Sequence, residues 1–189
     1  MKTLLLSLLS IGALATEAFS QAGAPVGPGS VKLGKLEPAG VKSPEFQIVG
    51  GPQKRSKTGT WLEFEVEYET KTDEIDELTF NFTVMVDNKL VDGNVTYITI
   101  PKGREHYAVM YITPRALEKL TGGKPITGSS VQNAWVTVSH QGQILDQPAA
   151  MKPSPIPNLP HLSGLLLNKN ETPFAPLFYD RYEAIKVTR

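Results

Sequence analysis

Two stretches of the chain alternate strictly between apolar and polar residues, and this alternation constrains the fold more than any other feature. Between Leu62 and Glu69, four apolar residues alternate with four glutamates. Between Leu78 and Val86, five apolar residues alternate with two threonines, an asparagine and a methionine. A period of two places successive side chains on opposite faces of a strand. Each stretch therefore predicts a strand with one buried face and one solvent-facing face.

Further strand signals occur between residue 45 and about residue 147. They are short apolar runs separated by turn residues, at 46–49, 95–100, 107–112, 131–140 and 143–146. We expect turns at 73–77 and 101–103, and one short helix that is capped by Thr113, starts at Pro114 and stops at Gly122. About seven short strands in one hundred residues predict an all-β fold, an immunoglobulin-like β-sandwich. A β-barrel is the alternative.

The N-terminus has the features of a signal peptide over residues 1–20. Lys2 precedes an apolar run from Leu4 to Ala15, and small residues near Ser20 offer cleavage sites. The apolar run is too short to span a bilayer comfortably, so we expect no transmembrane span in the mature chain. The chain contains no cysteine. This fits a bacterial envelope protein in the periplasm, on the outer membrane surface or outside the cell better than a disulfide-stabilised eukaryotic domain.

The composition of the flanking segments predicts the domain organisation. Residues 21–44 are rich in Gly, Pro, Ala and Ser without a hydrophobic period, and indicate a linker. Residues 45–150 hold the predicted sandwich. Residues 151–189 combine four closely spaced prolines with an aromatic C-terminal segment. Prolines exclude residues 151–160 from a central strand.

The C-terminal segment is too aromatic for a disordered tail, so we expect it to dock on a surface. Four of the fifteen aromatic residues of the chain lie between Phe174 and Tyr182. We predict a helix that starts at Pro176 and ends near Val187. Phe178, Tyr182 and Ile185 would share one face of this helix. A helix of about twelve residues is marginal in water and needs a packing partner.

Catalytic and metal-binding signatures are absent from the sequence. Its three histidines, His106, His140 and His161, have no ligand spacing, and no nucleophile elbow, phosphate loop or dinucleotide fingerprint occurs. The glutamates of 63–69 predict a solvated strand face, with lysines or threonines expected on the neighbouring strand. We predict no enzyme, no cofactor and no metal. The nineteen basic and nineteen acidic residues cancel, which gives no support for nucleic-acid binding.

Both tryptophans fall on outward faces by parity. Trp61 shares its side with the glutamates, and Trp135 lies opposite Ala134 and Val136. Such residues could bind a sugar ring, a partner protein or the C-terminal segment of the chain itself, and we favour the last for Trp135. The candidate interaction residues are Trp61, Trp135, Phe174, Phe178, Tyr179, Tyr182 and Ile185.

The C-terminal sequence Glu-Thr-Pro-Phe-Ala-Pro-Leu-Phe-Tyr-Asp-Arg-Tyr-Glu-Ala-Ile-Lys, residues 171–186, resembles the ends of secreted proteins from Verrucomicrobia and Planctomycetes. One similar set is encoded beside type IV pilus-like assembly genes in Akkermansia, and a member of that set has a signal peptide, an immunoglobulin-like sandwich and this kind of tail. The resemblance is strongest over residues 160–187 and looser over 45–150. It implies an envelope or pilus-associated role and no catalytic residues. Because the type IV pilin signal is missing, the chain is not expected to be the fibre subunit.

The sequence therefore predicts an exported, non-enzymatic envelope protein that is a structural or interaction component of a pilus-like or secretion assembly. Its partners would be envelope or pilus-like assembly proteins. The alternative is a carbohydrate- or mucin-binding module that uses exposed aromatic residues to bind glycans.

Overall fold

The structure is a computed structural model that describes residues 25–46, 49–51, 58–124 and 130–187. The predicted signal peptide lies outside these residues. The fold is all-β with a single short α-helix in the described part, as the sequence predicts. Its strands form one hydrogen-bonded sheet that is antiparallel except for one short parallel pair. No helix in the described ranges is long and apolar enough to cross a membrane.

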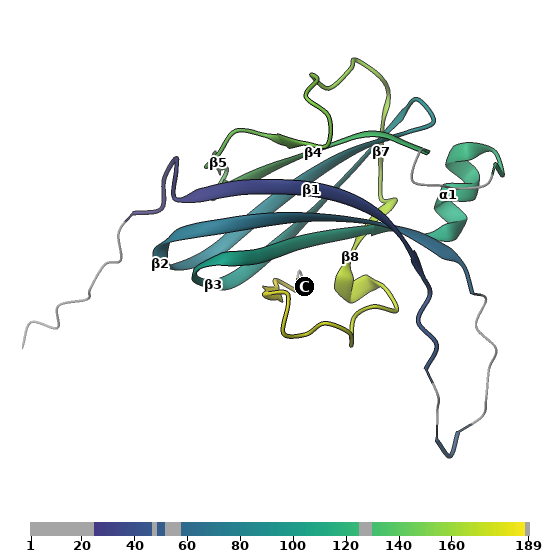
Figure 1. Cartoon of the computed structure of the whole chain (residues 1–189), viewed down its shortest axis with the longest axis horizontal. Helices are drawn as coiled ribbons and strands as arrows, with labels where there is room; N and C mark the ends of the chain where they lie inside the picture. Colours follow the sequence, from purple (N-terminus) through teal and green to yellow (C-terminus); the bar gives the residue numbers. More distant parts are fainter. Residues whose placement is uncertain (1–24, 47–48, 52–57, 125–129, 188–189) are drawn as a thin grey trace, which may run out of the picture.

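A long bent hairpin forms the centre of the fold (Figure 1). It consists of β2 (Thr60–Val86) and β3 (Lys89–Ile112), joined by a tight turn at Asp87 and Asn88. Both turn residues have positive φ angles of 47° and 59°, as expected for a two-residue turn that matches the twist of the strands. The sequence predicts four separate strands here. The expected turns at 73–77 and 101–103 are instead irregularities in the β2–β3 register, which shifts between Tyr68 and Glu74.

Because the hairpin bends, each of its two long strands contributes to both layers of a sandwich. β1 (Val31–Lys42) pairs with residues 60–70 of β2, and β4 (Val131–His140) pairs with residues 79–86. Rings from the two halves meet in the core, where the centroids of Tyr68 and Phe80 lie 4.8 Å apart. The apolar members of both alternating stretches are buried in this core, which confirms the predicted facing of 62–69 and 78–86.

The predicted linker is wrong over residues 31–42, which form β1. Val31 and Leu36 of this strand are buried in the core. A bulge between Leu33 and Leu36 breaks the alternation, so the strand carries no clean period of two. The predicted first strand at 46–49 is also wrong at Phe46, which is exposed and has no regular secondary structure; residues 47–48 lie outside the described ranges.

The predicted helix is confirmed as α1 (Pro114–Thr121). The Ala116 amide donates to the Thr113 hydroxyl over 3.0 Å, and Gly122 ends the helix with a φ of 64°. After β4, a turn at Gln141–Gly142 leads to β5 (Gln143–Ile144), and β6 (Ala149–Ala150) then returns along β4.

The C-terminal part of the chain runs along β3 instead of forming the predicted helix. It contains β7 (His161–Ser163), β8 (Leu166–Asn168), the 3-10 turn η2 (Lys169–Glu171) and β9 (Ala184–Ile185). Residues 173–183 are turns and irregular structure. Phe178 has a φ of 53°, which no α-helix tolerates, and the backbone near the end of the segment bonds to β3 instead of to itself.

Candidate interaction site

We call residues 161–187 the C-terminal clasp, because they cover an outward face of the sandwich and one edge of β3 (Figure 1). Phe174 is the apolar anchor of the clasp. Its ring stacks on Tyr111 at a centroid distance of 4.8 Å and meets Trp61 edge-on at 5.6 Å. These three residues and Val109 form a second buried cluster, separate from the main core. The predicted docking of the aromatic tail therefore takes place on its own domain.

Glu65 holds the clasp at a second point. The Arg181 guanidinium donates to both carboxylate oxygens of Glu65, over 2.6 and 3.1 Å, and the Tyr182 hydroxyl donates to the same carboxylate over 2.5 Å. Arg181 also lies 3.6 Å from the centre of the Tyr107 ring, a cation–π distance. The hydrogen bond to Glu65 raises the pKa of Arg181, so the guanidinium stays charged across the physiological pH range.

Burial beneath the clasp changes the titration of the neighbouring groups. Desolvation raises the pKa of Glu63, which lies on the same row as Glu65. Desolvation also raises the pKa of Tyr111 and of Tyr182, so both phenols stay neutral. The row of glutamates is thus not the fully solvated face that the sequence predicts, because part of it is covered by the clasp.

The third attachment point joins Glu183 of the clasp to His106 of β3. The His106 Nδ1 lies 3.1 Å from the Glu183 carboxylate, and its Nε2 lies 3.4 Å from the Thr70 hydroxyl. An acid, a histidine and a hydroxyl in this order resemble a nucleophile triad. The Thr70 hydroxyl, however, is buried, donates to the Pro101 carbonyl over 2.7 Å and accepts from the Gly103 amide over 2.9 Å. These two hydrogen bonds fix the Thr70 hydroxyl at the bend of the hairpin, where it stabilises the backbone.

The remaining attachments lie near the end of the chain and along its course. Lys186 pairs with Glu77, and the Lys186 amide donates to the Thr96 carbonyl over 2.8 Å. The other two histidines also pair with carboxylates, His140 with Asp76 and His161 with Asp92. Within the described part of the chain, no group of three or more His, Asp or Glu side chains is arranged to hold a metal ion.

The two tryptophans lie on the predicted faces but are not exposed platforms. Trp61 is 8% exposed, beneath Phe174. Trp135 is 4% exposed, and its indole N–H donates to the Ser154 carbonyl over 2.7 Å. The expected docking of the C-terminal segment on Trp135 is therefore wrong, because the segment that follows β6 covers this residue instead.

The other predicted residues divide into anchors and exposed residues. Besides the buried Phe174, the anchors include Tyr182 and Ile185, which are partly buried and pack against the core. Phe178 is 55% exposed and Tyr179 is 83% exposed. We call residues 176–180 the aromatic tip, since this turn lies between the anchors Phe174 and Arg181 and presents two rings to solvent.

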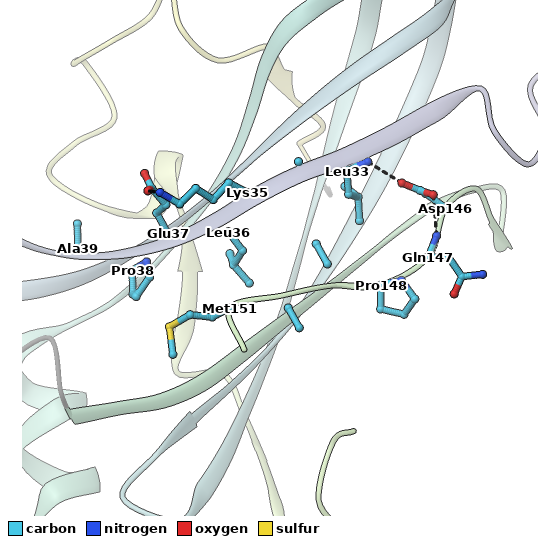
Figure 2. A pocket seen from close by; sticks show the side chains of 13 residues that line it. Leu33, Lys35, Leu36, Glu37, Pro38, Ala39, Asp146, Gln147, Pro148 and Met151 are labelled. Carbon is cyan, nitrogen blue, oxygen red and sulfur yellow. Dashed lines mark hydrogen bonds and ion pairs between the residues drawn. The ribbon is translucent and has the colours of Figure 1, made fainter. Parts of the chain in front are cut away.

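A groove of about 620 Å³ lies on another side of the sandwich, between β1 and the segment that contains β6 (Figure 2). Leu36, Pro38 and Met151 contribute apolar surface to it. Asp146 lies at one end of the groove, where its carboxylate accepts a hydrogen bond from the Leu33 amide over 2.7 Å. Lys35, the basic residue of this groove, is paired with Glu37. The groove brings together no acid–base pair suited to catalysis.

Sequence reasoning missed the polar side chains that fix the clasp. These are Glu65, Tyr107, His106, Arg181, Glu183 and Lys186. Lysines or threonines were expected on the neighbouring strand, but Glu65 faces Val109 on β3 and Glu37 on β1. The partner comes from a residue 116 positions later in the chain. The available signal was the opposite charge of the members of each pair, Glu65 with Arg181 and Glu77 with Lys186.

A protein-family model matches residues 22–189. The chain belongs to this family. The match contains β1, the sandwich and the clasp, so the clasp is part of the unit that defines the family. A crystal structure of a protein from Akkermansia muciniphila is similar, with 27% sequence identity and a TM-score of 0.73 over 84% of this chain and 94% of that chain. No curated protein matches the sequence.

Proposed function

We propose that the protein is an exported, non-enzymatic component of the bacterial cell envelope, and that it serves a pilus-like or secretion assembly as a structural or interaction subunit. The observation that carries the proposal is the aromatic tip. The turn is fixed at both ends, by Phe174 and by Arg181, yet leaves Phe178 and Tyr179 without cover. Rigid, exposed aromatic residues are typical of the residues that dominate protein–protein binding energy.

The backbone of Phe178 gives a second argument for a binding role. A φ of 53° is unfavourable for a bulky residue and costs on the order of 1–2 kcal/mol. The ring is more than half exposed, so little burial within the molecule offsets this cost. Backbone strain of this kind clusters at binding and switch sites, which supports a binding role for the tip.

The proposal of a non-enzymatic role rests on the sequence, which has no catalytic signature, and on the structural use of the polar groups in the described part of the chain. The Glu183–His106–Thr70 arrangement holds the clasp and the hairpin bend. Export is supported by the signal-peptide features of residues 1–20. The likeness to a protein from Akkermansia muciniphila supports a bacterial origin.

The test replaces Phe178 with asparagine, which accepts a positive φ but removes the ring. In a strain that lacks the wild-type gene, we expect Phe178→Asn to fold and to reach the envelope, but to lose cross-linking to its assembly partner and to impair the assembly. Ile144→Asn is the matched control, because it removes an exposed apolar side chain on β5. Unchanged cross-linking and assembly with Phe178→Asn would refute the role of the tip.

Export is tested separately by fractionating cells and sequencing the N-terminus of the mature protein. A chain that retains residues 1–20 in the cytoplasm would refute the envelope proposal.

Glycan binding is the alternative function that the exposed rings of Phe178 and Tyr179 favour. Binding of the purified protein to a mucin glycan array, lost with Phe178→Asn and Tyr179→Ala, would support that alternative over a protein partner.

A further inference from the structure

We propose that the C-terminal clasp is exchangeable. Residues 161–187 of one copy bind the same surface of a second copy of this chain, and this exchange joins the copies into dimers or open chains. We call this surface, the edge of β3 with Trp61 and Tyr111, the seat of the clasp. The inference rests on the contacts of the clasp and on the connection that precedes it, and it does not depend on where the protein resides. It goes beyond the role of the aromatic tip, because it assigns a partner to the face that the clasp covers.

The seat of the clasp belongs to the sandwich, so each copy can bind a clasp from itself or from a second copy. β7 pairs with residues 90–92 of β3, β9 with residues 97–98 and β8 with residues 110–112. Without the clasp, these stretches of β3 would present unpaired backbone groups, and Trp61, Val109 and Tyr111 would be exposed beside them. A bare strand edge next to an apolar face binds extended chain segments.

The clasp has short regular elements, and its internal hydrogen bonds, such as those of Thr172 with Lys169 and Phe174, move with it as a unit. Its strands have three, three and two residues, and its 3-10 turn has three. Its anchors instead contact the sandwich: Phe174 contacts Trp61 and Tyr111, and Arg181 contacts Glu65. Such a segment gains the same contacts from a second copy as from its own domain. The balance between the two forms then depends on effective concentration and on the connection.

The connection between β6 and β7 is suited to this exchange. Its start is fixed, because Asn133 binds the Lys152 carbonyl and Trp135 binds the Ser154 carbonyl. From there to Pro160 most residues are exposed, and three more prolines follow Pro153. Proline-rich chain is stiff and prefers an extended form. In the closed molecule this stiff segment leaves the sheet in an arc before it returns to β7 (Figure 1).

The distances show why the arc is needed. Lys152 and His161 lie on opposite sides of β4, β2 and β3, at the level where Asn133, Met85 and Leu90 are paired. Four strand spacings of about 4.8 Å make this span about 19 Å. Nine residues of extended polyproline-type chain reach about 28 Å. The closed form must therefore bend a stiff segment, whereas the exchanged form lets it run straight into a neighbour. Short, stiff hinges favour exchange of this kind.

The test uses the fact that the chain has no cysteine. Ile98 of β3 and Ala184 of β9 are directly paired, at a spacing that a disulfide can bridge. Full-length protein with only Ile98→Cys is mixed with full-length protein with only Ala184→Cys, incubated at high concentration and in 1 M salt, returned to dilute buffer and oxidised. No molecule in this mixture can form the disulfide within itself.

We expect a covalent heterodimer that increases several-fold when the protein concentration rises tenfold. A mixture of Ile98→Cys with Asp180→Cys, whose second cysteine lies in the exposed tip, measures random cross-linking. The double variant Ile98→Cys/Ala184→Cys must close within one molecule in dilute solution, which verifies folding and the seat. A closed double variant with no heterodimer above the random control would overturn the proposal, as would a double variant that fails to close.

The hinge is tested by replacing Pro153, Pro155 and Pro157 with glycine in both partners. A flexible hinge closes on its own domain more easily, so we expect the heterodimer to decrease at least threefold. An equal or larger amount of heterodimer would overturn the role assigned to the stiff connection.

Discussion

Thr99 has a backbone conformation that is unfavourable for a β-branched side chain. It lies in the middle of β3 with a φ of 57°, although β-branched residues rarely adopt positive φ. Its side chain is exposed, so its replacement creates no cavity. We expect Thr99→Asn to stabilise the protein by about 0.5–1 kcal/mol, because asparagine tolerates this region. Urea unfolding measures the change. Thr137→Asn, in β4 at an ordinary φ, should give no gain, and an equal gain there would contradict the argument.

Phe174 is the residue that carries most of the apolar contact of the clasp. Its removal leaves a space between Trp61 and Tyr111. We expect Phe174→Ala to lower the stability of the docked clasp by about 3–5 kcal/mol, the usual cost of deleting a buried phenylalanine side chain. Trp fluorescence should report the exposure of Trp61. Tyr179→Ala in the exposed tip should change stability by less than about 0.5 kcal/mol. A similar loss for both variants would refute the assigned anchor.

Glu63 makes the stability depend on pH in a direction opposite to that of most carboxylates. Burial raises its pKa in the folded state, so the folded chain binds more protons than the unfolded chain just above the ordinary glutamate pKa. Stability therefore falls as the pH rises through this window. We expect the melting temperature of Glu63→Gln, relative to wild type, to be higher at pH 7 than at pH 4. Glu67→Gln, an exposed residue of the same row, is the control. A relative melting temperature that does not increase with pH would contradict the prediction.

The sequence predicted the faces of individual residues well but not their exposure. Parity placed Trp61 and the glutamates on one outward side, and the structure places them there. Parity contains no information on what covers a face, however. The covering residue Phe174 lies over one hundred positions away, and only a folded chain shows that it reaches Trp61 and not Trp135.

At the scale of elements, local signals identified strands and caps but not the continuity or the context of the elements. Thr113 and Gly122 predicted the ends of α1 correctly, because capping depends on neighbouring residues alone. The helical spacing of Phe178, Tyr182 and Ile185 predicted a helix that does not form. Tertiary pairing of β9 with β3 and the contacts of Glu65 determine the conformation there instead. A short segment has too little intrinsic helix stability to resist such contacts.

The clasp is expected to open separately from the sandwich when its ionic contacts are weakened. Glu65→Gln removes the charge that Arg181 and Tyr182 bind. Loss of hydrogen bonds to a charged group costs about 1.5–3 kcal/mol. We expect faster hydrogen exchange at residues 184–186 and faster trypsin cleavage after Arg181, with little change in the core of β2. Glu67→Gln serves again as the control. Equal acceleration in the clasp and the core would show that the two parts open together.

At the scale of the whole molecule, the hairpin of β2 and β3 is the framework on which β1, β4 and the strands of the clasp pair. Each strand crosses both layers, so the turn signals within them mark bends and not chain reversals. Irregularities of register at Tyr68–Glu74 allow these bends. A single sequence could not distinguish a bend from a turn, because both favour the same polar and glycine residues. The fold class was predictable from the alternation, whereas the connectivity was not.

The domain begins at β1, and not at residue 45 as composition predicted. β1 pairs with residues 60–70 of β2 and places Val31 and Leu36 in the core. Burial of these two side chains contributes about 3–6 kcal/mol, a large share of the 5–15 kcal/mol by which a typical domain is stable. A chain that starts at residue 44 also leaves the edge of β2 unpaired. We expect it to aggregate or to remain unfolded by circular dichroism, whereas a chain that starts at residue 25 should fold and unfold cooperatively. A cooperatively folded chain without β1 would show that residues 31–42 are an accessory to the domain.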